Sequence, residues 1–151
     1  MKKLLGTALL LVATGAFGQN AQNLASVDGV IVTSVGEYQP FSIATGNVRN
    51  CEVDNYFTRC DLVDSSVTIS TSAGEETVQL TRYLYSQDAI GDTEWEEWIY
   101  IGTWEREVND IMLTSDIRFV VFDRSDVTGY FGYMRLDEFD KTHQFKARVA
   151  R

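Results

Sequence analysis

The residues best suited to chemistry in this sequence are a group of aromatic side chains near the middle of the chain. Trp95, Trp98, Tyr100 and Trp104 fall within ten residues. Side chains alternate between the two faces of a strand, so Trp98, Tyr100 and Trp104 would share one face. Flat aromatic rings on a sheet can stack on sugar rings or peptide side chains, which makes these three residues candidates for ligand binding. Tryptophan is also heavily buried on average, and we favour a place in the core for the whole aromatic group, Trp95 included.

Carboxylates overlap this aromatic group. Five acidic residues and no basic residue occur between Asp88 and Glu97. Clustered oxygen ligands suit calcium, but their spacing here does not match an EF-hand loop. Two carboxylates could also serve a glycosidase, yet a chain with 22 acidic residues contains many accidental pairs. We therefore interpret the segment as a solvated acidic loop and strand edge, with a carboxylate-based hydrolase as a second alternative for function.

Other catalytic signatures are missing from the sequence. His143 is its single histidine and stands between Lys141 and Lys146, which fits a surface histidine in a basic terminal strand. The sequence contains no Gly-x-Ser-x-Gly elbow, no HExxH pair and no glycine-rich phosphate loop. We therefore expect a protein that is not an enzyme and that uses no cofactor and no metal.

Two cysteines, Cys51 and Cys60, are expected to form a disulfide. Eight residues separate them, with Asp54-Asn55 as turn residues near the middle. Folding the chain about the bond between residues 55 and 56 places the cysteines opposite each other in a hairpin. The loop-closure model assigns so short a loop at most about 3 kcal/mol, so the bond would staple one hairpin.

The first 18 residues have the pattern of a cleaved bacterial export signal. Lys2 and Lys3 precede an uncharged apolar run, and Ala16-Phe17-Gly18 places small residues before a cut at Gln19. The run is shorter than the roughly 20 apolar residues that a transmembrane helix needs. We therefore expect a periplasmic or secreted protein, with no stable membrane insertion after cleavage.

Acidic residues dominate the charge of the chain. Its formal charge is −9, and loss of residues 1–18 removes two lysines and no acid, which gives −11. Nucleic-acid binding and binding to anionic lipid both use clustered basic residues, so neither partner is expected. We expect a non-catalytic binding role, first toward an envelope or extracellular protein. The alternative is a carbohydrate or small-ligand module that uses Trp98, Tyr100 and Trp104.

Short runs of β-branched and aromatic residues predict the strands that position the aromatic, acidic and cysteine side chains. Apolar and polar residues alternate with period two at 66–70, 78–84 and 145–149. The unbroken run Phe119-Val120-Val121-Phe122 suits a central strand covered on both faces. Further strands are expected at 30–35, 38–44, 48–53, 56–63, 95–104 and 130–136.

These runs predict a single all-β domain. The chain has 151 residues, 44% of them hydrophobic, which is enough for one core. After a flexible polar lead over 19–27, we expect an antiparallel sandwich or small barrel of about eight to ten short strands over 28–151. The apolar residues between 104 and 113 fall at helical spacing, so this segment is consistent with one short helix as well as with two strand ends. These residues are Trp104, Val108, Ile111 and Met112.

Overall fold

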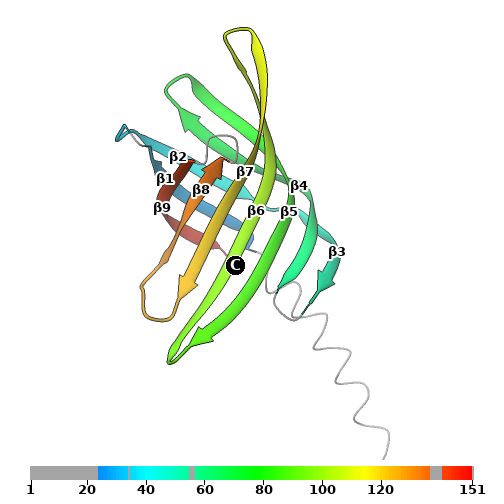
Figure 1. Ribbon diagram of the computed structural model, residues 1–151, viewed down its shortest axis with the longest axis vertical. Coiled ribbons are helices and arrows are strands. Elements are labelled where there is room, and N and C mark those ends of the chain that lie inside the picture. The colour runs from blue at the N-terminus through cyan, green and yellow to red at the C-terminus, as the bar shows by residue number, and fades with distance from the viewer. Residues whose placement is uncertain (1–23, 34, 55–56, 137–140, 151) are drawn as a thin grey trace, which may run out of the picture.

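The computed structural model describes residues 24–33, 35–54, 57–136 and 141–150, which form one domain of β-strands (Figure 1). The strands are β1 (Ser26–Val32), β2 (Tyr38–Ala44), β3 (Asn47–Val53), β4 (Thr58–Thr71), β5 (Gly74–Ile90), β6 (Thr93–Val108), β7 (Ile111–Arg124), β8 (Tyr130–Leu136) and β9 (Lys141–Ala150). The described residues include no helix. The all-β class and the single domain are therefore confirmed.

All nine strands belong to one antiparallel sheet that curls back on itself. The order of backbone pairing is β2-β1-β9-β8-β7-β6-β5-β4-β3, and a further pairing joins β2 to β4. Because β2 pairs with both β1 and β4, eight strands complete a ring, and β3 is an extension paired with β4. The domain is thus barrel-like, and we call the ring the barrel.

The long strand β4 pairs with two different strands along the same edge. Its first half pairs with β3 and its second half with β2. Between the halves β4 bulges from Asp61 to Ser65, and Asp64 has a φ of 55°. Gly46, in the link from β2 to β3, lies against this bulge, because a Cβ there would stand 2.5 Å from the Val63 carbonyl oxygen. The close approach of two backbones explains the glycine.

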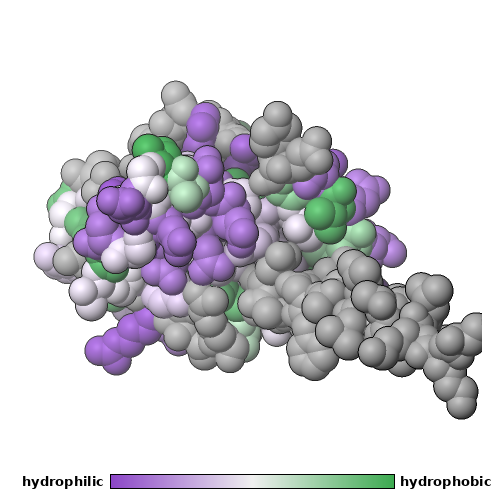
Figure 2. Space-filling view, turned by 90° about the horizontal axis from the view of Figure 1, so that it is seen from below, coloured by the Kyte–Doolittle hydropathy of each residue, from purple (hydrophilic) through white to green (hydrophobic). Residues whose placement is uncertain are grey.

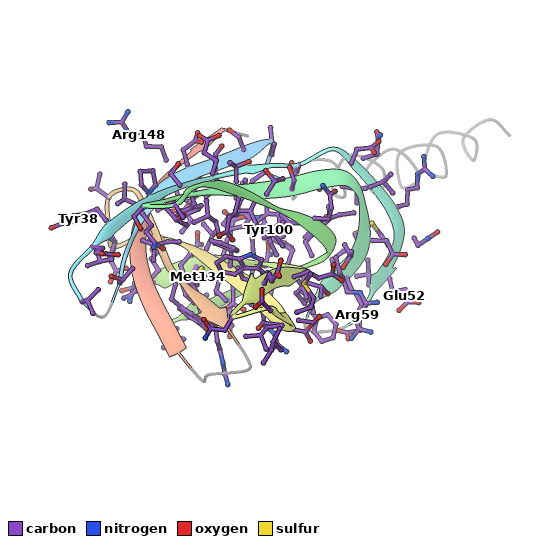
Figure 3. All side chains as sticks on the ribbon, turned by 90° about the horizontal axis from the view of Figure 1, so that it is seen from above. Tyr38, Glu52, Arg59, Tyr100, Met134 and Arg148 are labelled. Carbon is purple, nitrogen blue, oxygen red and sulfur yellow. A yellow bond between two sulfur atoms is a disulfide. The ribbon has the colours of Figure 1, made fainter. Side chains whose placement is uncertain are left out.

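The barrel interior is filled by apolar side chains from every second residue of the strands. The largest fully buried side chains are those of Trp98, Tyr83, Tyr100, Phe119, Leu24, Ile31, Ile43, Ile69 and Ile117. In Figure 3, Tyr100 and Met134 lie inside the barrel, whereas Tyr38 and Arg148 point away from it. This pattern is the alternation expected of an antiparallel sheet with one face on the core.

Of the two alternatives for residues 104–113, one short helix or two strand ends, the structure shows the strand ends. These residues are the paired ends of β6 and β7, a hairpin that projects beyond the rest of the barrel (Figure 1). Asn109 and Asp110 connect the strands with φ values of 52° and 62°. Two successive residues with positive φ make the turn whose twist matches a hairpin. The turn interrupts the period-two alternation, which is why the apolar residues on its two sides imitate helical spacing.

Strand lengths and the start of the domain also differ from expectation. β4, β5, β6 and β7 have 14, 17, 16 and 14 residues and are not short. β1 begins at Ser26, and Leu24 before it is fully buried, with its carbonyl oxygen accepting a hydrogen bond from the Thr45 hydroxyl. Part of the expected polar lead is therefore built into the barrel.

Residues 1–23, with the expected signal peptide and its cut, lie outside the described residues. Within the described ranges, no helix is long and apolar enough to cross a membrane.

Cys51 and Cys60 form the expected disulfide, with 4.2 Å between their Cα atoms. The bond joins β3 to β4 beside the pairing of Glu52 with Arg59. Cys60 is fully buried, and its Sγ lies 3.4 Å from the Tyr83 hydroxyl. The disulfide therefore ties the outlying strand β3 to the barrel.

Candidate functional site

The three aromatic residues considered for ligand binding lie inside the barrel. Trp98 and Tyr100 are 0% exposed, and Trp104 is 9% exposed. Trp98 packs against Tyr85 with 5.5 Å between ring centroids, and Tyr100 packs against Tyr83 at 6.2 Å. The core interpretation is therefore confirmed for these three residues, which do not form an aromatic surface on which a ligand could stack. It is wrong for Trp95, which is partly exposed.

Burial also changes the acidity of the interior tyrosines. It raises the pKa of Tyr100 far above the usual value of 10.0, an effect that the backbone of Leu24 offsets in part. It raises the pKa of Tyr83 as well. Both hydroxyls are consequently protonated at neutral pH, and these two rings contribute no charge to the core.

A different set of aromatic side chains lies on the outer side of the barrel. Trp95 on β6, Phe122 on β7 and Phe131 on β8 form a row across three neighbouring strands. The ring centroids of Trp95 and Phe122 are 6.1 Å apart at an interplanar angle of 16°, and those of Phe122 and Phe131 are 5.5 Å apart at 26°. Tyr133 adjoins the row, 6.2 Å from Phe122. All four side chains are partly exposed, and we call them the aromatic face.

Strand alternation explains why these rings point outward. Trp95 lies three residues before the buried Trp98, so it faces the opposite side of β6. Phe122 follows the buried Val121 in the same way, and Phe131 is its cross-strand partner on β8. Pairing across neighbouring strands thus gathers side chains from distant parts of the chain on one surface.

A groove of about 420 Å³ runs along the aromatic face. The residues that line it are Ile90, Thr93, Trp95, Phe122, Arg124 and Phe131. Ile90, at the turn between β5 and β6, is 73% exposed. The Arg124 guanidinium donates two hydrogen bonds to the Asp126 carboxylate, at 2.9 and 2.7 Å, so its charge is compensated. The groove is therefore mainly apolar.

An acidic cavity of about 500 Å³ adjoins the groove at Trp95, which lines both. The other residues around this cavity are Gln87, Asp88, Ala89, Glu94, Glu96, Asp123 and Ser125. Its wall is fixed in part by the Tyr85 hydroxyl, which donates a hydrogen bond of 2.7 Å to Glu96. Figure 2 looks onto the end of the barrel that carries the β5–β6 turn and shows hydrophilic side chains gathered there with hydrophobic ones beside them. The described residues contain no group of three acidic, histidine or cysteine side chains placed to hold a metal ion.

Glu97 lies on the outer side of β6 and not in the acidic cavity. Its cross-strand partner on β7 is Phe122. Burial beside the aromatic face raises the pKa of its carboxyl. A carboxylate-based hydrolase would need a shifted carboxyl in the acid-lined cavity, so the position of Glu97 gives that alternative no support. His143 lies on β9, and the structure describes only the backbone of this residue.

Sequence analysis did not single out Phe122, Phe131 and Tyr133 for binding. The position of Trp95, an odd number of residues from Trp98, places it on the opposite face, but its partners depend on the register of three strands. Comparison of the chain with protein-family models, curated proteins and solved structures finds no match. The case for a function therefore depends on the surface itself.

Proposed function

We propose that the protein is an exported, non-catalytic binding module that holds another protein on its aromatic face. The observation that carries this proposal is the row of partly exposed rings from Trp95 to Phe131, which lies in a groove on the outside of the barrel. The packed core does not account for these rings, because Trp98, Tyr100 and Phe119 already fill the interior. Exposed apolar patches with aromatic anchors are typical of protein interfaces.

The lining of the groove favours a protein over a carbohydrate. Sugar sites combine aromatic faces with several polar groups at fixed positions. Here the rings are flanked by Ile90, and the polar lining residues are Thr93 and Arg124, the second of which is held by Asp126. Such a surface offers much apolar area and few directed hydrogen bonds. It therefore suits the side chains of another protein better than a sugar ring.

Two features support an extracytoplasmic site of action. The Cys51–Cys60 disulfide fits an oxidising compartment, and the pattern of residues 1–18 is that of an export signal. The proposal accordingly places the protein in the bacterial periplasm or outside the cell. Its partner would be an envelope or extracellular protein, and the acidic net charge argues against nucleic acid.

Site-specific photocrosslinking in the native host tests this proposal. A photoreactive residue replaces Ile90 at the edge of the groove. A matched variant carries the same residue at Ile111, which is 61% exposed on the β6–β7 hairpin, away from the groove. We expect a discrete protein adduct from position 90 that position 111 does not form, and that Phe131→Ser diminishes.

The proposal fails if both positions give the same adduct, or if Phe131→Ser leaves the adduct from position 90 unchanged. It also fails if position 90 forms no protein adduct while a glycan array retains the protein through the same groove. That last result would instead support the carbohydrate alternative.

A further inference from the structure

We infer that the bound partner presents a segment in which a basic side chain stands beside apolar ones, with the apolar side chains in the groove and the basic one in the acidic cavity. The inference rests on the proposed function and names the chemistry of the partner. Its basis is the position of Trp95, which lines both hollows. One continuous segment that passes Trp95 would therefore contact an apolar surface and an acidic surface together.

The charge of the cavity selects a cation. The carboxylates of Asp88, Glu94, Glu96 and Asp123 line the cavity. Its described lining includes no lysine or arginine. Arg124 lies in the groove instead, and its hydrogen bonds to Asp126 at 2.9 and 2.7 Å hold it there. Like charges that meet across an interface are unfavourable, so the cavity rejects an acidic segment and attracts a basic one.

Trp95 is suited to both parts of such a segment. The face of an indole is the aromatic surface that best accepts a lysine or arginine cation. Its Nε1 atom is buried and, within the described part of the chain, has no hydrogen-bond partner. An unpaired buried donor is unfavourable. A docked segment that offers a carbonyl oxygen to Nε1 would satisfy this donor.

Binding of two model peptides to the purified protein tests the inference. Both peptides have eight residues in which leucine and phenylalanine alternate with a charged residue, which is lysine in one peptide and glutamate in the other. Shifts of the indole N–H signals in ¹H–¹⁵N spectra report binding, and Trp95→Phe identifies the signal of Trp95. We expect the lysine peptide to shift this signal and to bind at least about tenfold more tightly than the glutamate peptide.

Two matched pairs of variants assign the effect to the two hollows. Glu94→Gln should weaken binding of the lysine peptide, whereas Glu105→Gln, an exposed acid on the same strand outside both hollows, should not. Ile90→Ser should weaken binding of either peptide, and Ile111→Ser should not. Both isoleucines are highly exposed, at 73% and 61%, so their replacement leaves the core intact.

The outcomes separate this inference from the proposed function. Equal affinity for the two peptides, reduced by Ile90→Ser, overturns the basic segment and leaves protein binding in the groove in place. No binding of either peptide, while the crosslink from position 90 still forms, also overturns the basic segment alone. Absence of peptide binding and of the crosslink rejects both.

Discussion

Replacement of Gly102 by alanine should destabilise the barrel where β6 passes an irregularity in β5. The pairing of these strands shifts between Leu80 and Arg82, and Gly102 is buried beside the shift. A Cβ at this position would stand 2.4 Å from the Gln79 carbonyl oxygen and 3.2 Å from Leu80 Cδ2. The nearer atom belongs to the backbone of a paired strand, so it cannot turn aside as a side chain could.

The magnitude follows from the size of this clash. Relief of a 2.4 Å contact requires the two backbones to separate by about 1 Å, and overpacking of a core of this kind costs about 1–3 kcal/mol. Alanine also lowers the conformational entropy of the unfolded chain, which offsets about 0.4–1 kcal/mol of this loss of stability. We therefore expect Gly102→Ala to lower the free energy of unfolding by about 1–2 kcal/mol. For a domain of this size, that loss corresponds to a fall in Tm of roughly 3–8 °C.

Urea denaturation followed by circular dichroism measures this change. Thr103→Ala is the matched control, because Thr103 is the next residue on the same strand and is exposed. Its effect should stay within about 0.5 kcal/mol. If Gly102→Ala is as stable as the parent protein, the close approach of β5 and β6 is wrong. The register of β5 against β6 at Leu80 and Gly102 would then be refuted as well.

Three further changes test the disulfide, the aromatic face and the β6–β7 turn. Reduction of the Cys51–Cys60 bond should lower the free energy of unfolding in urea by at most about 3 kcal/mol and leave the β spectrum intact, whereas complete unfolding on reduction would contradict its role as a local staple. Burial raises the pKa of Glu97 above its usual 4.5, so the charged form of this side chain destabilises the folded protein. This loss of stability sets in as the pH rises above 4.5. Glu97→Gln should therefore raise Tm at pH 7 and hardly at pH 4, and an equal gain at both values would exclude this cause. Asp110→Val places a β-branched residue at a φ of 62° and should cost about 1–2 kcal/mol in thermal unfolding, whereas no cost would argue against the tight turn.

Features that depend on local pattern could be predicted from the sequence. The alternation at 66–70 and 78–84 indicates strands because one face of each must be buried, and both segments lie in β4 and β5. The disulfide depends on a short hairpin whose centre is marked by turn residues. Its register, with Glu52 opposite Arg59, is the one that folding about the 55–56 bond requires. In both cases the relevant interactions are close in sequence.

The turn at Asn109 and Asp110 shows where local pattern misleads. Apolar residues on either side of a two-residue turn fall three or four positions apart, which is also the period of a helix. Asn and Asp tolerate positive φ better than most residues, so the pair was a signal for a hairpin. The strands outside the turn, which pair from Trp104 with Ser115 to Val108 with Ile111, override the helical spacing.

The aromatic face could not be predicted from the sequence, for a different reason. Trp95, Phe122 and Phe131 lie on three different strands and are separated by up to 36 residues. They become a surface only when the registers of β6, β7 and β8 bring them into a row. The row therefore depends on two successive hairpin registers, one between β6 and β7 and one between β7 and β8. No short window of the sequence contains that information.

The most direct test of the account measures the affinity of the protein captured at position 90 for surface variants of the barrel. Ile90→Ser and Phe131→Ser alter the groove, and Met112→Ser removes an apolar side chain that is 63% exposed on the projecting hairpin. The account predicts that each groove variant raises Kd by at least about tenfold, equivalent to about 1.4 kcal/mol, whereas Met112→Ser leaves it unchanged. Equal Kd values for the parent protein and for both groove variants would contradict the claim that the aromatic face binds the partner.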